Sequence, residues 1–117
     1  MAAADYDLLI EQGATFTLSI VWKDNANAPI NITGYSARMQ IRKTYDDTPS
    51  ISLTSAVGGG IVLGGVSGTI DITIAASVTD DITILRGKYD LELELAGVVT
   101  RLIQGTVCIS REVTKNV

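Results

Sequence analysis

The chain contains no histidine, and this absence removes much of the chemistry that enzymes use. Histidine titrates near neutral pH, serves as the base in serine and cysteine hydrolases, and is a common ligand of zinc. Ser-His-Asp catalysis, Cys-His catalysis and most zinc sites are therefore excluded. We expect a protein that is not an enzyme and that has no catalytic residues, no cofactor and no metal site.

Cysteine, basic residues and aromatic residues are also scarce. Cys108 is the single cysteine, so it has no partner for an internal disulfide, which favours folding in a reducing cytoplasm. Nine Lys and Arg stand against 13 Asp and Glu, and the net charge of -4 argues against a nucleic-acid partner. Aromatic residues make up only 5% of the chain, which disfavours a sugar site built on exposed rings.

Long apolar runs are absent as well. No run approaches the roughly 20 residues of a membrane helix, and Met1–Asp5 lacks the basic start and apolar stretch of a signal peptide. We therefore expect no membrane partner. Hydrophobic residues nevertheless make up 46% of the 117 residues and charged residues 19%, so the apolar excess belongs to a core or to a partner surface. The length predicts one domain over residues 1–117.

What the sequence does contain is alternation with a period of two. Apolar and acidic residues alternate over Tyr89–Leu95, and Ala96-Gly97 then breaks the pattern, as in a half-buried strand that enters a tight hairpin. About seven or eight short strands at spacings of roughly 8–15 residues indicate an all-β sandwich or barrel. The other predicted strands are 14–22, 35–42, 51–54, 69–74, the hairpin return 98–103 and the closing strand 105–110, with a hairpin or bulged strand at 58–65.

Between the strands the sequence predicts little regular structure. Ser77 is expected to cap a single helical turn whose first turn holds Asp80 and Asp81. Met1–Asp5 and Thr114–Val117 are expected to be loose, flexible arms. The residues predicted to face the core are Phe16, Leu18, Ile20, Trp22, Tyr35, Met39, Ile41, Ile51, Leu53, Ile70, Ile72, Ile74, Tyr89, Leu91, Leu93, Leu95, Val107 and Ile109.

Several short motifs have a structural interpretation that outweighs a functional one. Gly58–Gly65 is not a phosphate loop, because no helix with Lys and Ser or Thr follows it, so its glycines are expected to serve turns and bulges. Asn31-Ile32-Thr33 matches a glycosylation sequon by coincidence, and Cys108 is expected to be a small, partly buried apolar residue. Turn and cap roles are favoured over calcium binding for the acidic groups Asp24 with Asn25 and Asn27, Asp46 with Asp47, and Asp80 with Asp81.

Charged residues occupy one face of two predicted strands. Arg38 and Arg42 lie on the outward face of one strand, and Glu92 and Glu94 on the outward face of another. If the two strands are neighbours, these residues form a cross-strand charge ladder. The alternative is that one of the two faces docks onto a partner. The sequence favours the ladder.

Three stretches together resemble the small β-sandwich domain of tailed-bacteriophage structural proteins, including the N-terminal domain of upper-baseplate, receptor-platform proteins. The first is Ile10–Phe16, which leads into a long alternating strand. The second is Pro29–Tyr35, which is similar to the family's step into an Arg-bearing strand. The third is Gly87–Leu93, followed by the hairpin Val98–Arg101 and the closing Gly105–Val107.

The resemblance covers about residues 8–112 and implies an Ig-like antiparallel sandwich that acts as an assembly or adaptor subunit in the tail, baseplate or neck of a virion. It implies other virion proteins and further copies of the chain as partners, synthesis in the host cytoplasm and localisation in the virion. Platform proteins continue into a coiled stem, whereas this chain stops at Val117, which suggests a ring, collar or decoration subunit.

Two other functions remain as alternatives. One is a sandwich that binds carbohydrate or a cell surface, for which Tyr6 and Tyr45 are the only rings expected to be exposed. The other is an enzyme, in which Asp71 or Glu92 would carry hydrolysis; the missing histidine weighs against it.

Overall fold

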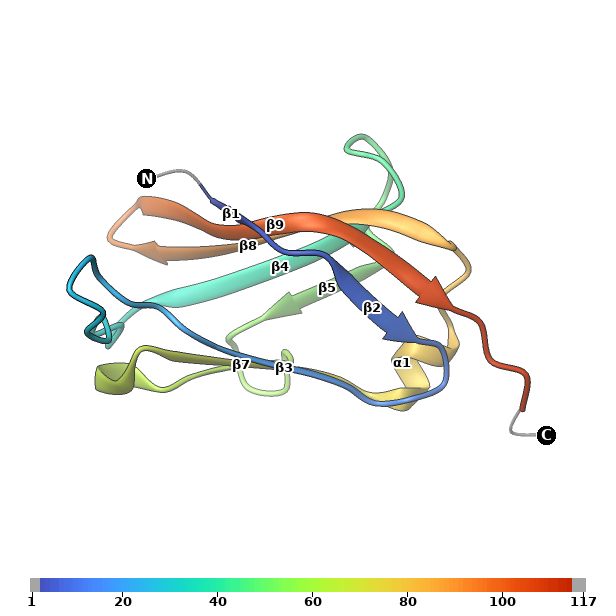
Figure 1. Ribbon diagram of the computed structural model, residues 1–117, viewed down its shortest axis with the longest axis horizontal. Helices are drawn as coiled ribbons and strands as arrows, with labels where there is room; N and C mark the ends of the chain where they lie inside the picture. The colour runs from blue at the N-terminus through green and yellow to red at the C-terminus, as the bar shows by residue number, and fades with distance from the viewer. Residues whose placement is uncertain (1–2, 115–117) are drawn as a thin grey trace.

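The computed structural model describes residues 3–114, which form two β-sheets packed face to face (Figure 1). The larger sheet has six strands in the order β1-β9-β8-β4-β5, with β2 also paired to β9, and the smaller sheet has three in the order β3-β7-β6. The predicted all-β sandwich is confirmed. In chain order the elements are β1 (Ala4–Asp5), β2 (Leu8–Glu11), β3 (Phe16–Val21), β4 (Ser36–Arg42), β5 (Ile51–Thr54), β6 (Ile61–Leu63), the 3-10 turn η1 (Gly65–Ser67), β7 (Thr69–Ile74), α1 (Ala76–Asp80), β8 (Arg86–Leu95) and β9 (Val98–Ser110).

The β8–β9 hairpin forms the centre of the larger sheet. Ala96 and Gly97, which connect its strands, have φ values of 51° and 84°, as a two-residue type I′ turn requires. The hairpin predicted from the break at these residues is confirmed. The prediction of two separate strands, a return strand over 98–103 and a closing strand over 105–110, is wrong, because both segments belong to the single strand β9. Within β9, Leu102 is an extra residue at a bulge opposite Leu91 and Glu92.

The N-terminal residues are part of the sheet rather than a loose arm. β1 and β2 both run parallel to β9, with Ala4 opposite Ile103 and Leu8 opposite Val107. The expectation of a free arm over Met1–Asp5 is therefore wrong for Ala4 and Asp5, while Met1, Ala2 and residues 115–117 lie outside the described residues. β2 itself was not predicted, because Leu8-Leu9-Ile10 does not alternate.

Gly105 allows the N-terminal segment to cross β9 closely. A Cβ at this position would lie 2.5 Å from the backbone oxygen of Tyr6, so a side chain would push the segment away. Tyr89 is directly opposite Gly105 on β8 and donates its hydroxyl to the same Tyr6 oxygen. Burial is the main cause that raises the pKa of Tyr89, followed by the charge of Asp7, so the hydroxyl stays protonated and able to donate.

The core lies between the sheets and follows the predicted alternation along the central strands. Ile70, Ile72 and Ile74 on β7 face Met39, Ile41, Leu91 and Leu93 on the larger sheet, and all are essentially inaccessible to water. Phe16, Leu18, Ile20, Trp22 and Tyr35 pack against this core but are only partly buried. The prediction for Leu95 is wrong: it is 40% exposed at the hairpin end. Buried apolar residues that were not predicted include Leu8, Ile10, Ile32, Ala37, Ile61, Ile82, Leu102 and Ile103.

The helical turn exists but is capped differently from the prediction. Ala75, not Ser77, is the N-cap residue, and Asp80 and Asp81 lie at the C-terminal end, where the helix dipole does not favour them. Thr79 on this turn is completely buried. Its hydroxyl lies 2.8 Å from the oxygen of Ala14 and accepts the N–H of Gly13 at 3.1 Å, which fixes the β2–β3 connection.

The predicted structural role of the Gly58–Gly65 segment is confirmed. Gly58 and Gly60 have φ values of 78° and 95°, which other residues rarely adopt. A Cβ on Gly59 would lie 2.4 Å from the oxygen of Thr54, so this glycine permits a close approach of two backbone segments. The segment contains one strand, β6, which joins the smaller sheet beside β7.

Candidate interaction surfaces

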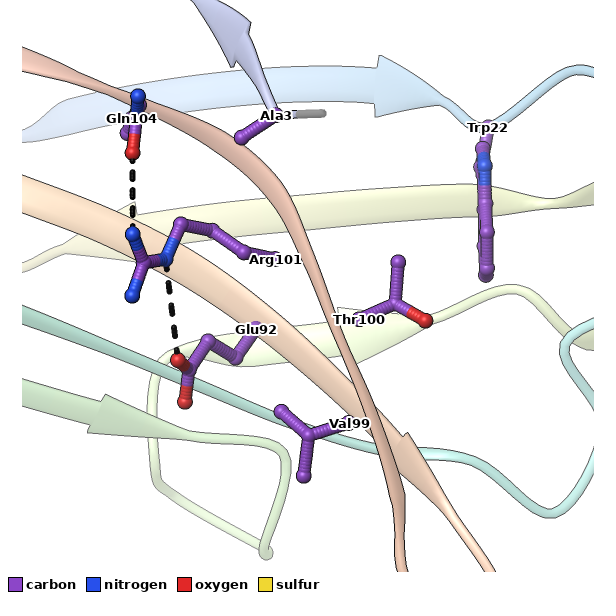
Figure 2. Close-up of a pocket in the computed structure, with 7 residues that line it drawn as sticks. All are labelled: Ala3, Trp22, Glu92, Val99, Thr100, Arg101 and Gln104. Carbon is purple, nitrogen blue, oxygen red and sulfur yellow. Dashed lines mark hydrogen bonds and ion pairs between the residues drawn. The ribbon is translucent and has the colours of Figure 1, made fainter. Parts of the chain in front are cut away.

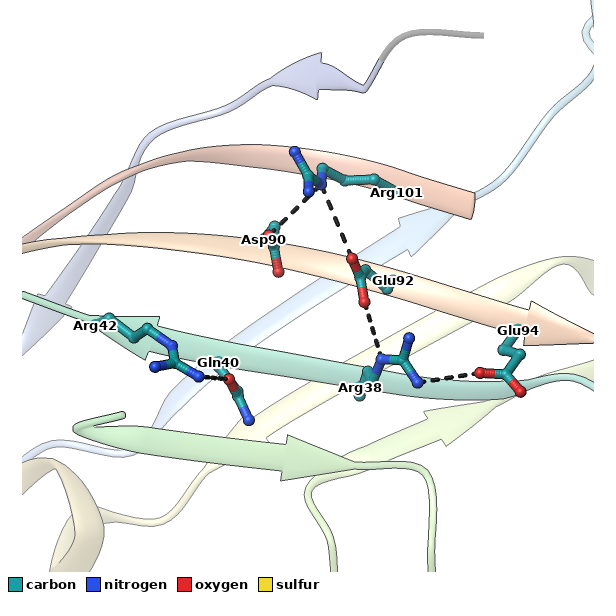
Figure 3. Close-up of polar contacts among 7 residues, drawn as sticks. All are labelled: Arg38, Gln40, Arg42, Asp90, Glu92, Glu94 and Arg101. Atoms are coloured by element: carbon teal, nitrogen blue, oxygen red, sulfur yellow. Dashed lines mark hydrogen bonds and ion pairs between the residues drawn. The ribbon is translucent and has the colours of Figure 1, made fainter. Parts of the chain in front are cut away.

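The outer face of the larger sheet carries a charge ladder across three strands (Figure 3). Arg38 on β4, Glu92 on β8 and Arg101 on β9 are directly opposite one another in the strand register. Arg38 Nε lies 2.9 Å from Glu92 Oε1, and its Nη1 lies 3.0 Å from Glu94 Oε1. The predicted ladder between these strands is confirmed for Arg38, Glu92 and Glu94.

Arg101 extends the ladder to β9, which the sequence did not reveal. Its Nε lies 3.5 Å from Asp90 Oδ2 and 4.0 Å from Glu92 Oε2, so Glu92 stands between two guanidinium groups. Arg101 also donates to Gln104 Oε1 at 3.2 Å, and Gln104 donates to Asp5 Oδ1 at 3.4 Å. The polar chain thus runs from β4 to β1 and links the N-terminal strand to the centre of the sheet.

The ladder shifts the ionisation of two of its members. The hydrogen bond to Glu92 is the largest cause that raises the pKa of Arg38. Burial, followed by the negative charge of Glu92, raises the pKa of Asp90, and Arg101 acts in the opposite direction. Burial outweighs the 3.5 Å ion pair with Arg101, because Arg101 is half exposed and solvent weakens its attraction.

Arg42 does not take part in the predicted ladder. It is opposite Lys88, not a glutamate, and its guanidinium instead donates to the backbone oxygen of Asp47 at 2.6 Å and to Gln40 Oε1 at 2.7 Å. Arg42 and Lys88 carry like charges at directly opposed positions, so they repel each other.

A recess of about 320 Å³ lies beside Arg42 and Lys88. Tyr45 lines this recess and is 80% exposed.

A larger groove of about 710 Å³ lies at the hairpin end of β9 (Figure 2). Figure 2 shows Trp22 and Thr100 on one side of β9, with Arg101 and Glu92 on the other. Trp22 contacts Tyr35 edge to face at 5.9 Å between ring centres, and its Nε1 is buried with no hydrogen-bond partner among the described residues. The groove brings together residues of β8 and β9 with Trp22, which directly follows β3.

Of the acidic groups considered for calcium binding, Asp24 stabilises a turn through side-chain hydrogen bonds. Asp24 Oδ1 accepts the N–H groups of Ala26 and Ala28 at 2.9 and 3.0 Å. Within residues 3–114 there is no group of three or more His, Cys, Asp or Glu placed to hold a metal ion. Asn31 of the sequon accepts both the N–H and the hydroxyl of Thr33, as in a local turn.

Three further side chains lie as the sequence predicted. Cys108 is partly buried on β9. Tyr6 is 51% exposed and Tyr45 is 80% exposed.

No helix in the described part of the chain is long and apolar enough to span a membrane.

Comparison with known proteins identifies the fold but not a family. No family model matches the sequence, and no curated protein matches it. Among solved structures, the chain is similar to one reported as "Parallel homodimer structures of the extracellular domains of the voltage-gated sodium channel beta4 subunit explain its role in cell-cell adhesion", with a TM-score of 0.53, 9% identity and 97% of each chain covered. The sandwich is therefore Ig-like.

Proposed function

We propose that this chain is a non-enzymatic structural subunit of a tailed-bacteriophage particle, an assembly or adaptor module of the tail, baseplate or neck. The observation that carries the proposal is the order of the three sequence stretches that resemble phage sandwich domains. Ile10–Phe16 leads from β2 into β3, Pro29–Tyr35 leads into the Arg-bearing β4, and Gly87–Leu93 lies within β8. All three stretches thus lie in strands of the Ig-like sandwich or in the segments that lead into them.

The polar surface is consistent with such a role. On the larger sheet, Arg38 and Arg101 are paired with the carboxylates of Asp90, Glu92 and Glu94, so this face does not require a charged partner. The strands at the sheet edges keep backbone groups that another polypeptide chain can use. Packing against copies of the chain and against neighbouring virion proteins is the mechanism we propose.

The direct test is to locate the protein in particles. We would raise antiserum against the purified chain and apply it, with gold labelling, to tailed particles prepared from the organism that encodes it. Labelling at the tail, baseplate or neck is the expected result. Particles that contain no trace of the chain by mass spectrometry would contradict the proposal.

The second candidate is a module that binds carbohydrate or a cell surface, which the recess beside Tyr45 favours. This ring is largely exposed next to Arg42, Lys88 and Asp90, a combination of a stacking surface and hydrogen-bonding groups. A glycan array separates the candidates: binding that Tyr45→Ala abolishes would support this function, and an array without signal would remove it.

A further inference from the structure

The free edge of the smaller sheet lies along β3. This strand pairs with β7 on one side only, while β7 is paired on both sides, with β3 and with β6. Phe16–Val21 contains neither a charged residue nor a proline, and the strand pairs with β7 without a register shift. Monomeric proteins normally protect an edge of this length with Lys, Pro or a bulge.

The other open edges are shorter or protected. β2 and β5 have four residues each, β6 has three and β1 has two. β9 is open over Val98–Leu102, beyond the end of β1, but that segment carries Arg101 and the bulge. β3 is therefore the longest unprotected edge in the described part of the chain.

The hydrogen-bond pattern shows which groups of β3 are available. The N–H of Trp22 donates to the oxygen of Gly68 at 2.9 Å, in register with the pairing of Ile20 to Ile70. In an antiparallel pair the residues alternate, so Ile20 and Leu18 also direct their backbone groups to β7. The N–H and C=O groups of Thr17, Ser19 and Val21 consequently point to the open side.

We propose that β3 pairs with β3 of a second copy of this chain, antiparallel and about a two-fold axis at Ser19. This inference deepens the proposed function, which expects copies of the chain to contact one another. The product is a closed dimer with a continuous sheet in the order β6-β7-β3-β3-β7-β6. The free backbone groups of each strand then satisfy those of the other.

The occupant is a second copy because the strand is complementary to itself in this register. Leu18 is then opposite Ile20 of the second copy on the inner side, and Thr17 is opposite Val21 on the outer side. Partly buried residues therefore meet on the inner face, and exposed residues meet on the outer face. Leu18 and Ile20 are only partly buried in the single chain, and the added strand covers them. The nearest charge, Lys23, is opposite Thr15, so no like charges meet.

Two directly opposed threonines provide a matched pair of variants. Thr17 on β3 and Thr73 on β7 are both exposed on the outer face of the smaller sheet. Thr17→Lys places a charge at the free edge, whereas Thr73→Lys places the same charge on a strand that is covered on both sides. Ser19→Pro removes an edge N–H without removing a backbone hydrogen bond to β7, although the hydrogen bond from Ser19 Oγ to Asp71 Oδ1 is lost.

The experiment is light scattering coupled to size-exclusion chromatography over a wide concentration range, with folding checked by circular dichroism. For the wild type and for Thr73→Lys we expect the fraction of dimer to rise with protein concentration. Thr17→Lys and Ser19→Pro should stay monomeric. A wild type that stays monomeric throughout would overturn the proposal. So would dimers that persist in Thr17→Lys, or that Thr73→Lys weakens equally, since the interface would then lie elsewhere or on the sheet face.

Hydrogen exchange of the unmodified chain gives a readout that does not depend on variants. Raising the protein concentration should protect the amides of Thr17, Ser19 and Val21 and leave those of Leu18 and Ile20 unchanged. Equal behaviour of both sets would refute edge pairing. A monomeric chain that gold labelling still finds in particles would refute the dimer alone, whereas a dimeric chain absent from particles would refute only the proposed function.

Discussion

Thr79 shows how one buried hydroxyl can hold two distant segments together. It is the one fully buried polar side chain among the described residues, and it satisfies backbone groups of Gly13 and Ala14 in the β2–β3 connection. A buried backbone group that loses its partner costs free energy because it has already given up its water. The isolated turn α1 therefore positions the start of β3.

Thr79→Val keeps the shape of the side chain but leaves these backbone groups unpaired. We expect the free energy of unfolding to fall by about 1–3 kcal/mol. Chemical denaturation measures the change, with Thr83→Val, at an exposed position, as the control. Equal stability of the two variants would contradict the role of Thr79.

Asp90 carries a charge that the fold disfavours. Burial and Glu92 raise its pKa, so the folded state holds the proton more tightly than the unfolded chain does. Stability accordingly falls as the pH rises through the interval between the unfolded and folded pKa values. We expect Asp90→Asn to be slightly more stable than the wild type at pH 7, with the difference vanishing below about pH 3, where Asp is neutral in both states. Thermal melts across this range measure it, and an advantage that grows on acidification would contradict it.

At the scale of elements, the sequence predicted best where one strand face is polar and the other is apolar. β4, β7 and β8 alternate cleanly, and their predicted inner residues are buried, except for Leu95 at the end of β8. β2 escaped prediction because parallel pairing with β9 buries Leu8 and Ile10 without any local signal. The bulge at Leu102 was equally hidden, since Leu102-Ile103 reads as a plain apolar pair although both are buried.

The candidate surfaces were predicted only in part for the same reason. Arg38, Glu92 and Glu94 could be placed on one face from their own strands. The addition of Arg101 depends on the bulge, which sets its register against Glu92. The open edge of β3 depends on where the N-terminal strands pair, and alternation does not contain that information.

The β8–β9 hairpin carries a strained residue at its turn. Ala96 has a φ of 51°, in the left-handed region that alanine adopts at a cost and asparagine tolerates better. We expect Ala96→Asn to raise the free energy of unfolding by about 0.5–1 kcal/mol. Ala28→Asn, in an exposed loop without positive φ, is the control. The midpoint of denaturation measures the effect. If Ala96→Asn has the same midpoint as the wild type, the turn is not strained.

At the scale of the whole molecule, the N-terminal strands are attached to the last strand. β1 and β2 pair along β9, and Tyr89 adds a hydrogen bond to the oxygen of Tyr6 from the neighbouring β8. The molecule measures 47 × 26 × 24 Å, and this attachment lies along its larger sheet (Figure 1).

Tyr89→Phe removes the hydroxyl and keeps the buried ring. We expect a loss of about 1 kcal/mol in stability, since the Tyr6 oxygen loses its donor. We also expect faster hydrogen exchange at the amide of Tyr6, which donates to the oxygen of Gln104. The amide of Leu91, in the middle of β8, should be unaffected. Unchanged exchange at Tyr6 would mean that the pairing with β9 holds the segment without help.

The attachment of β1 and β2 to β9 also sets the order of events during synthesis. Their pairing partners, Ile103–Ser110, leave the ribosome long after β1 and β2 themselves. Until they emerge, Leu8 and Ile10 have no strand to join, and the larger sheet lacks its centre. We therefore expect the nascent domain to stay incompletely folded until β9 has been synthesised, and its contacts between distant residues to make refolding slow for its size.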